Sequence, residues 1–160
     1  MILQSERLKI VSLSFNELVD YVTSRKGFVK SEDDEMKVWE KTIIPMSNDK
    51  IENHPYYTFW VGYLDGKDIL QVGVLAPVNE YGVVEIWVEV NEQYRGNGFG
   101  GEAMTALIEW LRNNEKVLFV GASIEPSNEA SRKMTLKCGF EYACDTLGMN
   151  IFFYNMKNTN

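Results

Sequence analysis

The chain has 160 residues, of which 45% are hydrophobic and 24% are charged. These values are typical of a globular protein, and the length suits one domain over residues 1–160. The formal net charge of −7 argues against nucleic acid as a partner, because phosphate binding requires clustered lysine and arginine residues. No apolar run approaches the ~20 residues that span a bilayer, so we expect a cytoplasmic protein without a membrane partner.

The cysteines and the histidine are too few for a structural framework. Cys138 and Cys144 are the two cysteines, and His54 is the one histidine. They cannot form a disulfide framework or supply the four ligands of a zinc site. We therefore expect reduced thiols and no metal.

The chain begins with a predicted strand and a predicted helix. Residues 7–13 alternate sufficiently for a strand. Ser14 and Glu17 then form a capping box, flanked by Leu13 and Leu18 as a hydrophobic staple. A helix is therefore expected to begin at about Ser14.

A second helix and three strands follow. Acidic residues after Ser31 suit the positive end of a helix dipole, and this helix is expected to stop before Pro45. Strands are predicted next, most simply as an antiparallel meander with a turn at residues 65–68. Their expected ranges are 58–64, 69–75 and 83–90.

The pattern then changes to alternating helices and strands. Apolar residues at helical spacing predict a helix over residues 99–113. A strand over 117–123, a helix over 128–137 that ends at Gly139, and a strand over 149–156 complete the chain.

Three glycines alternate in the loop just before the helix of residues 99–113. They are Gly96, Gly98 and Gly100, and Arg95 precedes them. Free backbone N–H groups and the helix dipole favour an anion there, and glycine lets a phosphate approach the backbone closely. A tight strand-to-helix turn would use the same glycines, but Arg95 adds a cation and favours phosphate.

The same loop fits a second pattern. Residues 96–101 satisfy G-x-G-x-x-G, the dinucleotide-binding fingerprint, with Glu125 as a candidate ribose partner. In the dinucleotide fold these glycines follow an early strand of an extended βαβ series. Here a meander precedes them and only one strand–helix–strand unit is evident. The context therefore favours coenzyme A.

The surroundings of the loop carry a longer pattern. Arg95, Gly98 and Gly100 match Arg/Gln-x-x-Gly-x-Gly/Ala, and EIWVEVNEQYRGNG and SNEASRKMTLKCGF flank the intervening helix. In these motifs, and in their order and spacing, the chain resembles the GNAT superfamily of acetyl-CoA-dependent N-acetyltransferases. The opening LQSERLKI and the pattern Asn128-x-x-Ser131 resemble its ribosomal-protein N-terminal acetyltransferase (RimJ/RimL-like) branch.

The resemblance implies a single-domain mixed α/β fold whose central sheet is mostly antiparallel and flanked by helices. The family's fourth and fifth strands, here residues 83–90 and 117–123, would be parallel and splay apart to admit the pantetheine arm of acetyl-CoA. Backbone groups would hold that arm and the pyrophosphate, and Asn128 would face the thiol end. The expected cofactor-binding residues are Val88, Val90, Arg95, Gly96, Asn97, Gly98, Phe99, Gly100, Asn128 and Ser131.

Attack of an amine on a thioester needs a base and an acid. Glu85 and Glu89 share one side of their strand because their spacing is even, and Glu125 follows the next strand. All three are also ordinary candidates for a solvated surface carboxylate. The identity of the base therefore stays open.

The acid is less easily assigned. Many family members place a tyrosine in the helix after the asparagine, but Thr135 stands at that position here. Ser131 matches a serine that the ribosomal-protein branch uses near the coenzyme A thiol, although serine is a poor acid and could serve only as a hydrogen-bond partner of the sulfur. Tyr142 is a reserve candidate.

Three other kinds of residue are interpreted mainly as structural rather than catalytic. Cys138 lies at a helix end without a neighbouring histidine, so we interpret it as core. A lone histidine such as His54 is more often a hydrogen-bonding residue than a catalytic one. The aromatic residues over 56–60 are expected in the core, with Tyr56 or Tyr57 as candidates to reach the acceptor pocket.

These features predict transfer of an acetyl group to a primary amine by direct attack in a ternary complex. The acceptor could be a polyamine, an antibiotic or a protein N-terminus, which the acidic residues 32–34 could attract. The missing tyrosine leaves an alternative, an acyl-CoA-binding sensor with little turnover. The segments expected to line the acceptor pocket, residues 25–60 and 145–149, do not identify the acceptor, and the oligomeric state stays open, a homodimer included.

Overall fold

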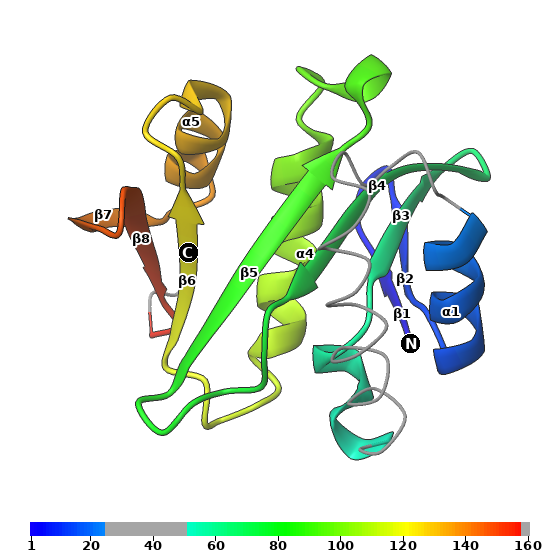
Figure 1. Cartoon of the computed structure of the whole chain (residues 1–160), viewed down its shortest axis with the longest axis horizontal. Helices are drawn as coiled ribbons and strands as arrows, with labels where there is room; N and C mark the ends of the chain where they lie inside the picture. Colours follow the sequence, from blue (N-terminus) through cyan, green and yellow to red (C-terminus); the bar gives the residue numbers. More distant parts are fainter. Residues whose placement is uncertain (25–50, 158–160) are drawn as a thin grey trace.

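The computed structural model describes residues 1–24 and 51–157, and within them one eight-stranded sheet has the order β1-β2-β3-β4-β5-β6-β8-β7 (Figure 1). All neighbouring strands pair antiparallel except β5 and β6, which are parallel. The strands are β1 Ile2–Gln4, β2 Lys9–Ser12, β3 Trp60–Leu64, β4 Lys67–Val74, β5 Val83–Val90, β6 Phe119–Ile124, β7 Glu141–Thr146 and β8 Met149–Asn155. The helices are α1 Phe15–Ser24, α4 Phe99–Leu111 and α5 Glu129–Lys137, with short 3₁₀ segments η2 Ile51–Tyr56 and η3 Glu92–Tyr94.

Helix α4 covers one face of the sheet, and α1 packs on the other face (Figure 1). Trp60 of β3 is fully buried and lies 5.0 Å from the ring of Trp110 in α4. The next residue, Val61, points to the opposite face and packs with Leu18 of α1. This alternation of successive side chains is what lets a helix cover each face.

The predicted start of α1 is confirmed. The Ser14 amide donates to the Glu17 carboxylate at 2.7 Å, and the Glu17 amide donates back to the Ser14 hydroxyl at 3.4 Å. Leu13 and Leu18 are buried together, as the hydrophobic staple requires. The predicted helix after Ser31 lies outside the described residues.

The predicted turn at residues 65–68 is shorter in the structure. Asp65 and Gly66 alone form it, with φ values of 50° and 76°, and Lys67 already belongs to β4. Two central residues with positive φ are typical of a tight hairpin, because they match the twist of the flanking strands. The meander of β3, β4 and β5 is confirmed.

Two strands have no signal in the sequence. β1 has only three residues at the edge of the sheet. β7 has no buried residue and no apolar alternation, so residues 145–149 resemble a loop although they form the hairpin between β7 and β8. Leu147 and Gly148 make its turn with φ values of 50° and 78°. An edge strand with both faces exposed needs no apolar pattern.

The parallel strands β5 and β6 pair at only three positions, from Val83 with Phe119 to Glu85 with Gly121. Beyond these pairs the two strands diverge (Figure 1). The implied splay is therefore present, and its vertex lies at Glu85 and Gly121. β6 begins two residues later than expected because the amides of Leu118 and Phe119 both donate to the Gly82 carbonyl just before the ladder begins.

Gly82 fixes the start of the parallel pair that leads to this vertex. Its φ is +75°, and a Cβ there would lie 2.7 Å from Leu118 Cγ and 2.9 Å from the Lys116 carbonyl oxygen. Asn79 supports the same turn, because its side-chain oxygen accepts hydrogen bonds from the amides of Tyr81 and Val83. The start of the parallel pair is thus held by backbone contacts that leave no room for a side chain.

We predict that Gly82→Ala lowers the free energy of unfolding by about 3 kcal/mol, because strain at positive φ adds to overpacking against a backbone oxygen. Gly66→Ala is the matched control, since Gly66 has φ +76° but no atom within 4 Å of the added Cβ. It should cost about 1 kcal/mol from strain alone. Urea unfolding of both variants measures the difference, and equal losses would contradict this account of the vertex.

Candidate active site

The loop between β5 and α4 has the backbone of an anion site. Gly96 and Gly98 have φ values of 80° and 82°, and Gly98 is the N-cap of α4. In the part of the chain that the structure describes, no protein group accepts a hydrogen bond from the amides of residues 96–101. Unpaired amides at a helix N-terminus, together with a left-handed residue before it, favour an anion.

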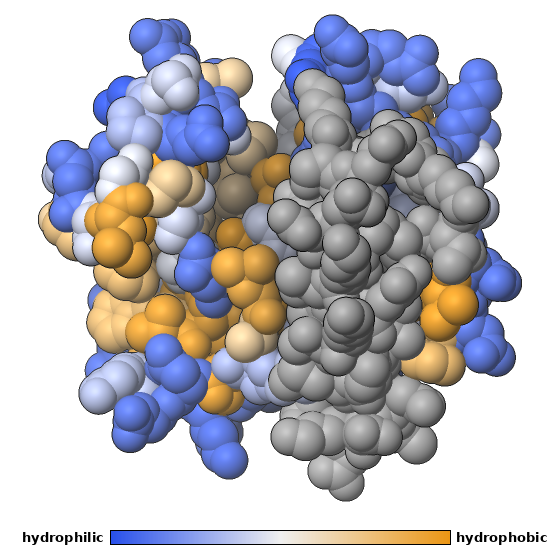
Figure 2. Space-filling model, viewed as in Figure 1, coloured by the Kyte–Doolittle hydropathy of each residue, from blue (hydrophilic) through white to orange (hydrophobic). Residues whose placement is uncertain are grey.

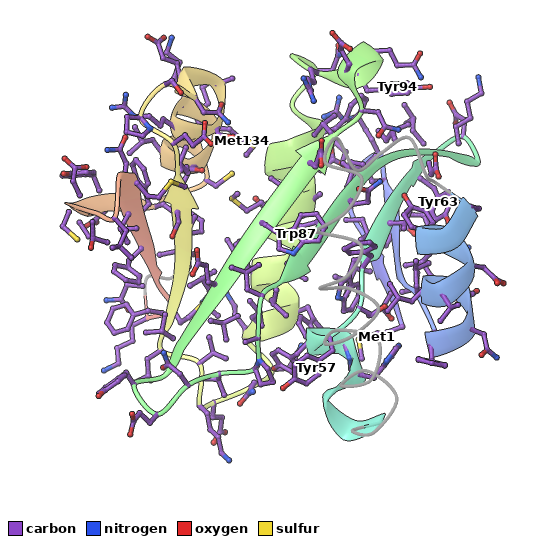
Figure 3. The ribbon with its side chains drawn as sticks, viewed as in Figure 1. Met1, Tyr57, Tyr63, Trp87, Tyr94 and Met134 are labelled. Atoms are coloured by element: carbon purple, nitrogen blue, oxygen red, sulfur yellow. The ribbon has the colours of Figure 1, made fainter. Side chains whose placement is uncertain are left out.

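Gly100 and Gly101 are required for packing, whereas the two glycines before them are required for their positive φ. A Cβ on Gly100 would lie 2.8 Å from Met134 Sδ and 3.2 Å from Val90 Cγ2. Gly101 faces Cys138, whose sulfur would be 3.4 Å from an added Cβ. These glycines therefore let α5 pack closely against α4, and Figure 3 shows Met134 on α5. The missing side chain of Gly100 is thus explained by packing, and its amide stays available to an anion.

Arg95 is tied to the end of β5, because its Nε donates to the Val90 carbonyl at 2.9 Å. Asn97 closes the loop from the other side, and its side-chain nitrogen donates to the carbonyls of Tyr94 and Arg95, both at 3.1 Å. The loop is thus shaped by its own side chains before any ligand is considered.

The edge of β5 that faces β6 carries the backbone groups expected to hold the pantetheine arm. Leu75 donates to the Glu85 carbonyl and Asn91 donates to the Ile69 carbonyl, so the odd-numbered residues of β5 bond to β4. The backbone groups of Val88 and Val90 therefore point away from β4, toward the splay.

Asn128 and Ser131 lie at the start of α5, beside the open end of the splay. Asn128 is the N-cap of the helix, and its side-chain oxygen accepts a hydrogen bond from the Ser131 amide at 3.1 Å. Ser131 is half-buried and Asn128 is exposed. The space-filling view is notched between α5 and the part of the molecule that carries the loop (Figure 2).

Glu85 and Glu89 lie on the face of β5 opposite α4, as their even spacing predicts. Glu85 is half-buried at the vertex, whereas Glu89 is exposed and pairs across the sheet with Gln71. Trp87 lies between them on the same face (Figure 3). Its ring is 5.3 Å from that of Phe59 in an edge-to-face arrangement. Glu125 is exposed beyond the end of β6.

Two further positions concern the acid: Tyr142, the reserve candidate, and Thr135, which stands where many family members have a tyrosine. Thr135 is fully buried, and among the described residues its hydroxyl has no hydrogen-bond partner. Tyr142 lies on β7, which β6 and β8 separate from β5, and it packs edge-to-face on Phe152. Neither position is suited to protonating a thiolate between β5 and β6.

Tyr56 and His54 have structural contacts. The Tyr56 hydroxyl accepts a hydrogen bond from Asn114, just after α4 ends, so it points away from the loop at the other end of that helix. Tyr57 is buried as well. A ring nitrogen of His54 lies 2.6 Å from the Leu13 carbonyl oxygen. The candidacy of Tyr56 for the acceptor pocket is therefore not supported.

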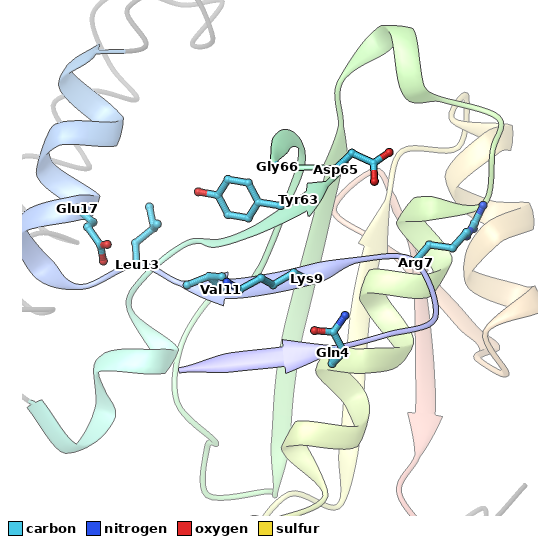
Figure 4. Close-up of a pocket in the computed structure, with 9 residues that line it drawn as sticks. All are labelled: Gln4, Arg7, Lys9, Val11, Leu13, Glu17, Tyr63, Asp65 and Gly66. Atoms are coloured by element: carbon cyan, nitrogen blue, oxygen red, sulfur yellow. The ribbon is translucent and has the colours of Figure 1, made fainter.

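A separate hollow of about 410 Å³ lies over β2 and β3, next to α1 (Figure 4). Residues of α1, the first three strands and the β3–β4 turn line it, and β4 separates these strands from β5. Within residues 1–24 and 51–157, no group of acidic, cysteine or histidine side chains is arranged to bind a metal ion. The described helices also include none that is long and apolar enough to cross a membrane.

The structure joins Arg7 and Glu102 across 95 positions of the chain. Arg7 also contacts the carbonyl of Asn97 in the loop. Arg7 lies in the opening LQSERLKI, which carries a family resemblance but gives the arginine no partner, and no pattern in the sequence singles out Glu102. The candidate site therefore extends to the turn between β1 and β2.

The sequence matches the model of the acetyltransferase (GNAT) family over residues 21–140, which is more than half of the chain. The chain therefore belongs to the GNAT family, and it is an acetyl-CoA-dependent N-acetyltransferase. The predicted fold class and cosubstrate are thus confirmed. A comparison with curated proteins gave no match.

Solved structures show the same fold at low sequence identity. The ribosomal-protein-S5-alanine acetyltransferase from Vibrio fischeri has a TM-score of 0.74 at 13% identity, covering 99% of this chain and 98% of that one. The spermidine N-acetyltransferase SpeG chimera from Vibrio cholerae and hSSAT has a TM-score of 0.70 at 12% identity, with 94% and 96% covered. AAC(6′)-Ib in complex with ribostamycin and coenzyme A has a TM-score of 0.66 at 15% identity, with 92% of each chain covered. The first of these agrees, at the level of the fold, with the ribosomal-protein branch.

The two cysteines should differ in reactivity. Burial raises the pKa of the Cys138 thiol above its ordinary value, more than its hydrogen bond with Thr105 lowers it, whereas Cys144 is exposed. Because the thiolate is the reactive form, a raised pKa leaves less of it at pH 8. In Cys144→Ser, we expect Cys138 to react with a thiol reagent about tenfold more slowly than Cys144 does in Cys138→Ala.

The same Cys138→Ala variant tests whether this thiol takes part in catalysis. Acetyl transfer should continue, because Cys138 packs between α5 and α4 and its hydrogen-bond partners among the described residues, Gly101 and Thr105, are not bases. Loss of transfer in a folded variant would contradict the structural interpretation.

Proposed function

We propose that the protein transfers the acetyl group of acetyl-CoA to a primary amine by direct attack in a ternary complex. The observation that carries this proposal is the splay of β5 and β6, whose facing edges are unpaired beyond Glu85 and Gly121, with free amides of the loop at its open end. An extended, polar ligand that ends in a pyrophosphate fits both features.

The residues present are consistent with coenzyme A. Amides of the loop and the start of α4 would bind the pyrophosphate, and the splay-facing backbone of β5 would bind the pantetheine arm. The Val90 carbonyl keeps one acceptor site, since an oxygen with one bond from Arg95 has a second lone pair. The proposed set is Val88, Val90, Arg95, Gly96, Asn97, Gly98, Phe99, Gly100, Asn128 and Ser131.

Acetyl-CoA supplies the thioester, and the chain supplies the groups that move protons. The amine nitrogen bonds to the acetyl carbon as the carbon–sulfur bond breaks, so the amine must lose a proton and the sulfur must gain one. Either Glu85 at the vertex or Glu89 farther along the same face would receive the amine proton. Ser131 at the start of α5 would hydrogen-bond the sulfur.

The acceptor side of β5 favours a cationic amine. Glu85, Trp87 and Glu89 follow one another along this face of the strand, and aromatic rings and carboxylates both attract ammonium groups. The acceptors in the names of the structural neighbours, a protein alanine and spermidine, are amines of this kind. A polyamine, an antibiotic or a protein N-terminus is therefore the acceptor class to examine first.

The first test is release of free thiol from acetyl-CoA in the presence of polyamines, aminoglycosides, amino acids and N-terminal peptides. We expect at least one class to accelerate release between pH 7 and 9, with an acetylated product of the expected mass. The rate should rise with pH, because more of the amine is then neutral. Tight coenzyme A binding without transfer to any amine would instead favour the sensor, the alternative left open by Thr135 at the position where many family members have a tyrosine.

Substitution of the two glutamates separates their roles. With an identified acceptor, Glu85→Gln should lower kcat by about 100-fold or more, because it removes a base at the vertex, whereas Glu89→Gln should act mainly on KM for the amine. Glu141→Gln on the exposed edge strand is the control for loss of a carboxylate. The opposite ranking would make Glu89 the base, and wild-type kcat in both variants would exclude them both.

A further inference from the structure

Arg7 joins the turn between β1 and β2 to the first turn of α4. Its backbone amide donates to Glu102 Oε1 at 2.7 Å, and its Nε donates to Glu102 Oε2 at 2.8 Å. A second guanidinium nitrogen lies 2.8 Å from the same Oε2, and the Ser5 hydroxyl donates to Oε1 at 2.6 Å. Figure 4 shows the Arg7 side chain extending from the turn toward α4, away from most of the hollow that it lines.

The same guanidinium also touches the loop. One nitrogen donates to the Asn97 carbonyl at 3.1 Å, and Cζ lies 4.3 Å from the centre of the Phe99 ring. Another nitrogen would be 3.5 Å from a Cβ on Gly98. A single side chain therefore contacts consecutive residues of the loop and the helix that it begins. An arginine suits this arrangement because its planar fork can bond a carboxylate and stack on a ring together.

The Glu102 carboxylate needs the positive charge of Arg7 beside it. Its side chain is 13% exposed, and it lies in the first turn of α4, where an anion is favoured by the dipole. Burial raises the pKa of Glu102, but hydrogen bonds from Ser5 and Arg7 outweigh burial and hold the pKa below its ordinary value. The carboxylate is therefore charged at neutral pH, and alone it would repel a pyrophosphate bound at the same end of the helix.

We propose that Arg7 is a positioning residue for coenzyme A. It holds the Asn97 carbonyl and the Phe99 ring, which keeps the loop amides free for the pyrophosphate, and it neutralises Glu102 beside them. It acts through the loop and lies apart from the reacting thioester. The inference rests on the proposed placement of the pyrophosphate at residues 96–101, and the experiment separates the two.

The direct test is the Kd of coenzyme A, measured by calorimetry. We expect Arg7→Gln to raise this Kd by about tenfold or more, because charge-assisted hydrogen bonds to both Glu102 and the loop are lost. The Kd of Arg7→Lys should lie between those of Arg7→Gln and the wild type, since a lysine keeps the positive charge but lacks the planar guanidinium. Lys9→Gln is the matched control, an exposed cation on the neighbouring strand, and its Kd should stay within about twofold of wild type.

A second readout distinguishes positioning from a general loss of structure. S-acetylpantetheine carries the same thioester without the pyrophosphate, so its kcat/KM with an amine acceptor should be the same in Arg7→Gln and wild type. Equal losses with acetyl-CoA and S-acetylpantetheine would overturn the inference. So would an unchanged Kd of coenzyme A in folded Arg7→Gln and Arg7→Lys.

Gly96→Glu tests the placement of the pyrophosphate on its own. A side chain at Gly96 meets no protein atom within 4 Å, but any side chain there is strained at φ 80°, so Gly96→Ala is the control that carries the strain without the carboxylate. We expect coenzyme A binding to be lost in Gly96→Glu and largely kept in Gly96→Ala. If it is lost here but unchanged in Arg7→Gln, only the role of Arg7 is wrong, whereas unchanged binding in Gly96→Glu would remove the placement and the inference together.

Discussion

The site depends on the short parallel pairing of β5 and β6. Three paired positions hold the strands together at one end, and each strand then continues with one partner only, β4 or β8. The edges that face each other keep free N–H and C=O groups in the middle of a sheet, where such groups are normally paired. The backbone itself therefore favours a ligand that supplies those hydrogen bonds between the diverging edges of β5 and β6, whatever side chains line the strands.

The open end of the splay is held by packing around α4. Met134 and Cys138 of α5 fit against Gly100 and Gly101, while Arg7 fastens the opposite side of the same helix turn. The loop with its amides lies between these two attachments. Helix α4 is therefore the element to which both halves of the candidate site are attached, so a change in its packing should be transmitted to the glycine loop.

Features carried by neighbouring residues could be predicted from the sequence. The capping box of Ser14 and the meander are confirmed, and the positive φ of Gly98 agrees with its place at a strand-to-helix turn. β7 could not be predicted, because an exposed edge strand needs no apolar alternation, and Tyr56 appeared free to reach the acceptor until Asn114 was found to hold its hydroxyl. For Tyr56 the missing information was a partner 58 positions along the chain.

The sequence by itself determined the family, the glycine loop before α4 and the alternation that puts Glu85 and Glu89 on one face, because φ preferences and side-chain periodicity depend on residues close together. Only the tertiary structure decided which glycines admit α5 and that Arg7 reaches Asn97 across 90 positions. Those contacts depend on the order in which strands join the sheet and on the helix that crosses it. No local pattern encodes that order, since the same turns and periodicities are compatible with many arrangements of strands.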